Sequence, residues 1–153
     1  MWVPPEDKDP TLLMAPTRKS VALFGAVNLR EGNLVTHFEK KFNAMTFRDF
    51  LIILLRHRRR TRKTVILLDN AKYHHAVLIR PFLKKHRDKL ALQFLPAYSP
   101  ELNPIERVWK LTRKLCTHNT YFEKLESLMD AVARQHAIWT IPNETLRKLC
   151  CVT

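Results

Sequence analysis

The sequence predicts a mixed α/β fold, and three observations support this prediction. Residues 20–42 have the pattern of a β-hairpin. Residues 64–95 show the order strand, helix, strand, which is typical of a parallel crossover unit. Beyond residue 103, apolar side chains recur at the spacing of amphipathic helices. The length of 153 residues suits one domain, and no internal repeat divides it.

The first predicted element after the start of the chain is the hairpin. Four of the nine prolines lie within residues 1–16, so we expect residues 1–19 to form an extended lead-in rather than a helix. Residues 20–29 are rich in Val, Ala, Leu and Phe and are predicted as a buried strand. Residues 34–42 are the return strand, and Gly32 supplies the positive φ that the connecting turn 30–33 favours.

A helix and a crossover follow the hairpin. The helix is expected to begin at Thr46 and to end in the basic run 56–60. Residues 64–68 are all apolar after Thr64, so we expect a parallel strand buried on both faces. A helical stretch over 75–86, kinked or split at Pro81, then leads to a second buried strand over 90–95.

Two helices are predicted after the crossover. The first begins at Pro104, and a last long helix spans 120–140, with a capping-box pattern at Thr120 and Glu123. Trp109 and Trp139 lie on apolar helix faces and are expected in the core. The predicted buried stripe of the first helix consists of Ile105, Val108, Trp109, Thr112 and Leu115.

Charge and composition narrow the classes of function. Lys and Arg number 27 against 14 Asp and Glu, a net charge of +13, so a nucleic acid is the expected partner and an anionic membrane surface the weaker alternative. Gly25 and Gly32 are the only glycines, which excludes both glycine-rich phosphate loops. The sequence has no long apolar run and no secretory signal, so we expect no membrane partner. The three cysteines lack metal-binding spacing and are expected to be reduced thiols, as in a cytoplasmic protein.

Two carboxylates are the strongest candidates for chemistry. Asp69 follows the strand 64–68, and Glu106 lies in the first turn of the helix after strand 90–95. We expect them to converge, because the carboxyl ends of parallel strands share one sheet edge. Carboxylates bind Mg²⁺, and two such ions about 3.5–4 Å apart promote in-line phosphoryl displacement. A structural interpretation stays open, with Asp69 as a turn residue and Glu106 in a capping box whose N-cap is Asn103.

The sequences around these carboxylates carry two motifs. Residues 65–75 are VILLDNAKYHH, and residues 95–109 are LPAYSPELNPIERVW. Both motifs, their separation of 36 residues and the upstream hairpin with Phe24-Gly25-Ala26 resemble DDE transposases of the mariner superfamily and related bacterial insertion sequences. The resemblance covers nearly the whole chain and implies an RNase H-like fold, in which Asp69 and Glu106 match the second and third catalytic acids.

This resemblance implies a metal-dependent activity on DNA. The family uses two Mg²⁺ or Mn²⁺ ions to cut element ends and to join the new 3′-hydroxyl to target DNA. It implies double-stranded DNA as partner, a homodimer or an intact transposase as protein partner, and association with the bacterial nucleoid.

One departure from the family pattern is the first catalytic Asp. Its central strand would precede Met1, and Glu6, Asp7 and Asp9 in the lead-in are poor substitutes. We therefore expect a truncated domain that lacks this strand and leaves two inner strand edges unpaired. By itself it should be inactive and marginally folded.

The remaining candidate site residues fall into two groups. The residues near the carboxylates are expected to support them, and the cations are expected to contact DNA phosphates. Two alternatives stay open: Lys110 could form an ion pair with Glu106, and the run 56–63 could be a solvated helix end. The supporting residues are Asn70, His74 and Asn103; the cations are Arg58, Arg59, Arg60, Lys110, Arg113 and Lys114.

Two alternative functions stay open. One alternative to the transposase interpretation is a non-catalytic basic nucleic-acid-binding remnant that docks to an intact transposase. The other is an RNase H-like nuclease with another role.

Overall fold

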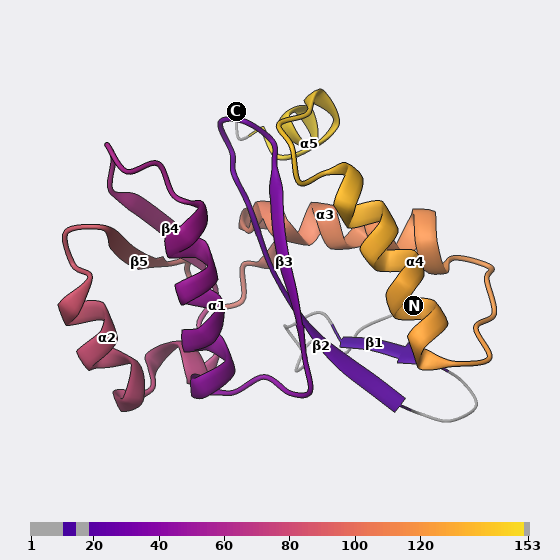
Figure 1. Cartoon of the computed structure of the whole chain (residues 1–153), viewed down its shortest axis with the longest axis horizontal. Helices are drawn as coiled ribbons and strands as arrows, with labels where there is room; N and C mark the ends of the chain where they lie inside the picture. Colours follow the sequence, from indigo (N-terminus) through magenta and orange to yellow (C-terminus); the bar gives the residue numbers. More distant parts are fainter. Residues whose placement is uncertain (1–10, 15–18, 152–153) are drawn as a thin grey trace. The chain divides into compact units, whose positions relative to one another are not determined.

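The computed structural model describes residues 11–14 and 19–151, which fall into two compact units (Figure 1). The hairpin unit contains residues 1–40 and 104–153, and the crossover unit contains residues 41–103. Each unit is described on its own. The lead-in acids Glu6, Asp7 and Asp9 lie outside the described residues.

The sheet of the hairpin unit has three antiparallel strands in the order β1-β2-β3. They are β1 (Thr11–Met14), β2 (Lys19–Val27) and β3 (Leu34–Glu39). The predicted hairpin is confirmed, and β1 is a strand within the expected lead-in. Among the described residues, β1 pairs with residues 19–22 of β2. Residues 23–27 of β2 pair with β3 but with no described strand on their other edge.

The hairpin turn is built by Asn28 and Gly32. The side-chain oxygen of Asn28 accepts hydrogen bonds from the backbone N–H groups of Arg30 and Glu31 at 2.9 and 3.1 Å. Gly32 has φ of 72°, a conformation that costs other residues free energy. Its carbonyl accepts a 2.7 Å hydrogen bond from the Asn143 side chain, which ties the turn to the start of α5 (Glu144–Leu149).

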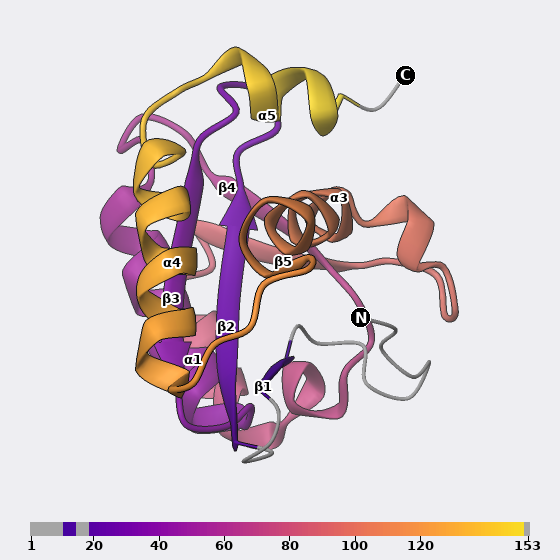
Figure 2. The same cartoon turned by 90° about the vertical axis from the view of Figure 1, so that its right-hand side faces the viewer.

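Two longer helices pack on the hairpin, α3 (Pro104–Thr112) and α4 (Leu125–Ile138) (Figure 2). Trp109 lies over Gly25 so closely that an added Cβ would come within 2.6 Å of Trp109 Cζ2, which explains glycine at this strand position. Trp109 and Trp139 are buried, as predicted. The core clusters of this unit consist of Val21, Leu23, Trp109, Leu128 and Val132, and of Leu34, Val108, Trp139, Leu146 and Cys150.

Two predictions for these helices are wrong. After Thr112 the chain continues as a π-helical turn (Arg113–Thr117), and its extra residue rotates the apolar stripe. Leu115 is consequently 54% exposed, while Cys116 packs against the core in its place. The last long helix begins at Leu125 without a side-chain cap, because the Thr120 hydroxyl donates to the carbonyl of His118 instead.

The crossover unit contains a parallel pair of strands, β4 (Thr64–Leu68) and β5 (Leu90–Phe94), as predicted. Helix α1 (Ala44–His57) precedes β4, and α2 (Arg80–Lys85) lies between the strands after the 3₁₀ turns Lys72–His75 and Val77–Ile79. A third 3₁₀ turn, Pro100–Leu102, follows β5.

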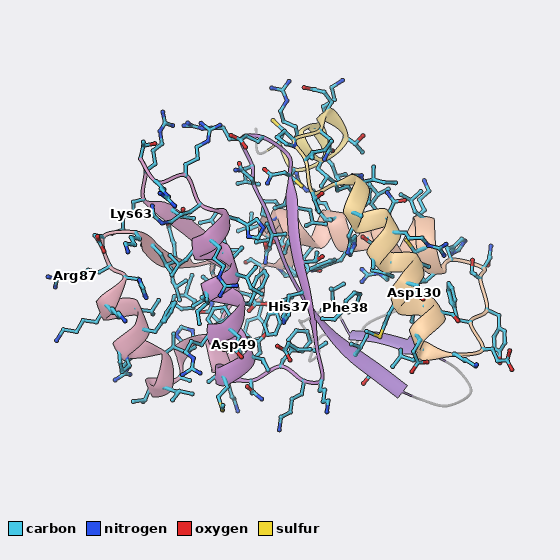
Figure 3. All side chains as sticks on the ribbon, viewed as in Figure 1. His37, Phe38, Asp49, Lys63, Arg87 and Asp130 are labelled. Atoms are coloured by element: carbon cyan, nitrogen blue, oxygen red, sulfur yellow. The ribbon has the colours of Figure 1, made fainter. Side chains whose placement is uncertain are left out.

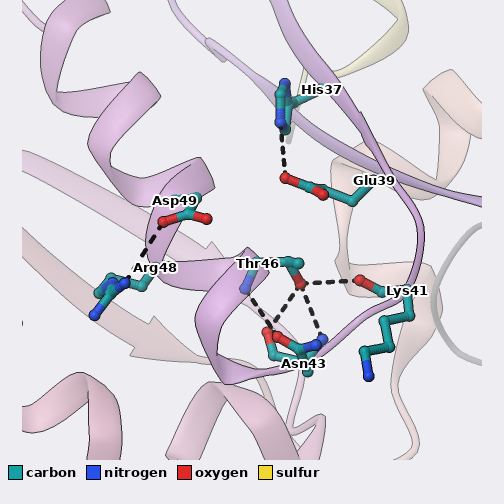
Figure 4. A network of polar contacts seen from close by, with 7 residues as sticks. All are labelled: His37, Glu39, Lys41, Asn43, Thr46, Arg48 and Asp49. Atoms are coloured by element: carbon teal, nitrogen blue, oxygen red, sulfur yellow. Dashed lines mark hydrogen bonds and ion pairs between the residues drawn. The ribbon is translucent and has the colours of Figure 1, made fainter.

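Two details of the crossover unit differ from the sequence predictions, and a third decides between two predicted alternatives. Asn43 caps α1, and Thr46 is its reciprocal partner three residues on rather than the first residue (Figure 4). Pro81 stands in the first turn of α2, where it needs no N–H partner, so of the predicted kink or split at Pro81 the structure shows the split, with 3₁₀ turns before Arg80 and α2 after it. One face of β4 is open, since Val65 and Leu67 are 55% and 38% exposed.

The three cysteines are free thiols. Burial raises the pKa of the thiols of Cys116 and Cys150, although Arg107 opposes the shift at Cys150. Thiols with raised pKa are poor nucleophiles at neutral pH, which supports a packing role. Among the described residues, no helix is both long and apolar enough to cross a membrane.

Candidate metal-binding and nucleic-acid site

Asp69 directly follows β4, at the carboxyl end of the parallel pair. Its Oδ1 atom accepts a 3.0 Å hydrogen bond from the backbone N–H of Ala71, which closes a local turn. The side chain is 22% exposed. The carboxylate is therefore held in one orientation at the edge where sheets of this type bind ligands.

His74 contacts the same carboxylate oxygen of Asp69. Its Nδ1 atom lies 3.2 Å from Asp69 Oδ1 and 3.0 Å from the Asp69 carbonyl oxygen. Both partners accept hydrogen bonds, so Nδ1 carries the proton and donates. This nitrogen cannot bind a metal ion, and the geometry supports the predicted role of His74 as a positioning residue.

Aromatic rings keep the His74 imidazole in place. The rings of Phe47 and Tyr73 lie 4.5 and 4.4 Å from it, centroid to centroid. His74 is buried as a result. A ring with this packing has few alternative rotamers, so the Asp69 carboxylate is braced by a rigid donor.

Asn70 links the ends of the two strands. Its side-chain N–H donates to the carbonyl of Leu95 at 2.6 Å, and its Oδ1 atom lies 3.2 Å from Nε2 of His75. The His75 ring in turn stacks on Phe94 at 4.0 Å. The loop after β4 is thus fastened to the end of β5, as the predicted bracing role of Asn70 requires.

Glu106 lies in the first turn of α3 in the hairpin unit and is half-buried. Asn103, the last residue of the crossover unit, is buried and immediately precedes this helix. Because Asp69 and Glu106 belong to different units, their convergence stays a prediction. The capping role of Asn103 stays one as well.

The predicted DNA-binding cations occupy different environments. Lys110 and Lys114 are exposed, and Arg113 is half-buried at the start of the π turn. In the run after α1, Arg59 and Arg60 are exposed. Arg58 is half-buried, and its guanidinium donates to the carbonyls of Arg59 and Arg60 at 3.2 and 3.4 Å, so it shapes the loop.

The donor set fits a hard divalent cation at Asp69. The carboxylate offers oxygen, and N–H groups of Ala71 and His74 fix its orientation, which is typical of carboxylates that bind metals. Within the described residues, no three His, Cys, Asp or Glu side chains cluster as a metal-binding group. Mg²⁺ and Mn²⁺ keep several waters, so one or two carboxylates per ion suffice.

Sequence reasoning missed one feature of the loop that follows β5. Tyr98, in the second motif, has a positive φ of 56° and is 87% exposed. A non-glycine residue in this conformation costs about 1 kcal/mol or more and is often found at functional sites. No local signal predicts it, because Pro96 and Pro100 restrict the residues directly before them, Leu95 and Ser99, and not Tyr98.

Comparison with known proteins identifies the family. The model of the DDE superfamily endonucleases matches residues 1–129, most of the chain. The chain belongs to the DDE superfamily endonucleases. The resemblance read from the two motifs is thereby confirmed.

Solved structures support the RNase H-like fold. The catalytic domain of the Mos1 mariner transposase superposes with a TM-score of 0.75 at 19% identity, covering 93% of this chain and 72% of that domain. The Mos1 strand transfer complex gives 0.69 at 23% identity, covering 98% and 44%. A chain of the simian T-cell lymphotropic virus intasome in complex with the PP2A regulatory subunit B56 gamma gives 0.61 at 14% identity, covering 81% and 45%.

One curated relative matches at the level of sequence. It is the uncharacterized protein y4pE/y4sA of Sinorhizobium fredii (strain NBRC 101917 / NGR234), 38% identical over 65 residues. The match spans 42% of this chain and 44% of that protein, less than half of either.

Proposed function

We propose that this chain forms part of the catalytic core of a DNA transposase that cuts and joins DNA strands with divalent metal ions. The observation that carries the proposal is the Asp69 carboxylate, held by Ala71 and His74 at the carboxyl end of β4 within a family match over residues 1–129. The neighbouring Mos1 structures include one with Mg and a paired end complex with Mn.

The residues have distinct roles in this proposal. Asp69 and Glu106 each bind a metal ion through carboxylate oxygens, and His74 and Asn70 keep the Asp69 loop in place. Bound Mg²⁺ or Mn²⁺ stabilises the attacking and leaving oxygens of an in-line displacement at phosphorus. The exposed Lys110 and Lys114 on and after α3 hold DNA phosphates beside Glu106.

The family uses three acidic residues, and the two motifs supply two of them. We therefore propose that residues 1–153 bind metal ions but need a third carboxylate to cleave DNA.

Metal affinity provides the test, because it does not depend on cleavage. We expect Asp69→Asn and Glu106→Gln each to weaken Mn²⁺ binding about tenfold or more, measured by electron paramagnetic resonance of free Mn²⁺. Asp88→Asn and Glu126→Gln remove exposed carboxylates and serve as matched controls that should bind Mn²⁺ like the wild type. Cleavage of DNA by the purified chain would contradict the need for a third carboxylate.

A second candidate function is a non-catalytic, basic nucleic-acid-binding protein. The charge of +13 favours it. If neither substitution changes Mn²⁺ affinity while DNA binding still weakens with salt, this second function replaces the first.

A further inference from the structure

The loops that enter β4 and β5 meet at the edge of the sheet opposite Asp69. Thr64 pairs with Leu90 in the parallel register, so the two strands begin side by side. The backbone N–H of Thr64 donates to the carbonyl of Lys89 at 2.9 Å. Residues 56–63 and 84–89, which are far apart in the sequence, therefore form one continuous surface, which we call the basic rim.

The basic rim is strongly cationic. It contains ten Lys and Arg residues with Asp88 as the single acid, and every one of the ten except Arg58 is exposed. Lys63 and Arg87 both extend outward from the side of the crossover unit where β4 and β5 begin (Figure 3). The ten cations are Arg56, Arg58, Arg59, Arg60, Arg62, Lys63, Lys84, Lys85, Arg87 and Lys89.

Five of these cations are not neutralised by a nearby carboxylate in the described part of the chain. Among the described residues, no ion pair joins Lys63, Lys84, Lys85, Arg87 or Lys89 to a carboxylate. Like charges at this density repel one another, and the repulsion is relieved when an anionic partner binds. The rim therefore has the composition of a binding surface rather than of a surface that only keeps the protein in solution.

We propose that the basic rim binds the phosphate backbone of duplex DNA, independently of metal ions and of base sequence. Both loops lack apolar side chains that could insert into a lipid bilayer, which favours a nucleic acid over a membrane. Exposed arginine and lysine heads are the groups that contact DNA phosphates.

The position of the rim defines its role. Strand β4 separates it from Asp69 by five residues, or about 17 Å at 3.3 Å per residue. That length corresponds to about five base pairs of a duplex. The rim therefore holds DNA at a distance from the reacting phosphate. This role is additional to the proposed metal chemistry, and it rests on the proposed function only in that both have DNA as the substrate.

The test is the salt dependence of DNA binding without divalent metal. Binding of the chain to a duplex of about 30 base pairs is measured by fluorescence anisotropy in EDTA, from about 50 to 200 mM NaCl. We expect the triple variant Lys63→Gln/Arg87→Gln/Lys89→Gln to reduce the slope of log K against log salt by about 2.7, since each lost phosphate contact contributes about 0.9.

A matched control removes the same charge elsewhere. The triple variant Lys124→Gln/Arg134→Gln/Lys148→Gln takes three exposed cations from the hairpin unit, and its slope should stay within about 0.5 of the wild type. The pair Lys84→Gln/Lys85→Gln on α2 gives an independent measurement, with an expected reduction of about 1.8.

Two outcomes would overturn the proposal. One is an equal reduction of the slope in the control triple, which would mean that net charge alone matters. The other is preferential binding of a duplex RNA of the same sequence, which would change the class of partner. Asp69→Asn should leave the slope in EDTA unchanged, so a failure of the metal site and a failure of the rim are distinguishable.

Discussion

The hairpin unit and the crossover unit differ mainly in charge. The crossover unit carries 14 Lys and Arg against four Asp and Glu, a net +10, whereas the hairpin unit carries 13 against ten, a net +3. The hairpin unit has two apolar clusters around Trp109 and Trp139. The crossover unit buries its own set of apolar side chains, Phe47, Phe50, Leu51, Leu68, Ile79 and Leu90. Both units therefore have an apolar core, and the crossover unit carries in addition most of the positive charge that would attract the proposed DNA partner.

The buried histidines of the two units also differ, in what their ring nitrogens contact. In the hairpin unit, the Thr112 hydroxyl donates to the carbonyl of Val108 at 2.9 Å, so at 3.0 Å it accepts from Nε2 of His136. Nδ1 of His136 is buried and has no hydrogen-bond partner among the described residues. In the crossover unit, His74 donates to Asp69. One histidine fills a core as a neutral ring, and the other positions a carboxylate.

The largest expected effect concerns the core of the hairpin unit. Trp109→Ala should lower the free energy of unfolding by about 3–5 kcal/mol, because the side chain is 3% exposed and touches both β2 and α4. Urea denaturation followed by circular dichroism measures it. Tyr121→Ala, at a residue that is 70% exposed, is the control and should change stability by less than about 0.5 kcal/mol. Equal losses in both variants would contradict the view that this unit depends on its tryptophan core.

The next effect is the pH dependence that His136 introduces. Burial lowers its pKa from 6.5 to about 4, so the unfolded chain binds this proton more readily than the folded chain. The free energy of unfolding is therefore not reduced by this residue above pH 6.5. It falls by about 3 kcal/mol in all as the pH is lowered from 6.5 to 4. Urea denaturation at a series of pH values measures the loss.

Two variants isolate this contribution. His136→Gln does not titrate, so its stability should vary less with pH between 6.5 and 4 than that of the wild type. His118→Gln removes an exposed histidine of the same unit and should leave the profile unchanged. Parallel profiles for the wild type and His136→Gln would show that His136 is not held neutral by its burial.

The smallest effect concerns the crossover unit. Asn43→Ala removes the hydrogen bond from the Thr46 N–H to Asn43 Oδ1, 2.9 Å long, and should cost about 1 kcal/mol of stability. Thermal unfolding compares it with Thr61→Ala, a control in an exposed loop. A loss no larger than the control's would mean that α1 is stabilised by its apolar face alone.

Local sequence patterns predicted most of the elements. The hairpin, the parallel pair of strands and the helix at Pro104 were each expected within a few residues of their observed bounds. These elements depend on periodicity, turn residues and prolines, which act over short distances. Asp69 was placed correctly at the end of β4 for the same reason.

The errors share a different cause. Leu115 continues the helical periodicity but is exposed because the π turn shifts the register after Thr112. Thr120 has the spacing of an N-cap, yet its hydroxyl bonds to His118. Val65 lies in an apolar strand that was expected to be buried on both faces, yet its side chain is exposed. Each depends on what the rest of the chain places nearby, which periodicity does not contain.

The sequence by itself determined the family, the two acidic candidates and the excess of positive charge, because these follow from residue types and their spacing. Tertiary structure decided which groups meet. It turned His74 into a donor to Asp69, and it brought residues 56–63 beside 84–89 through the register of β4 and β5. Such contacts join residues through packing and hydrogen bonds across the fold, so no local pattern could reveal them.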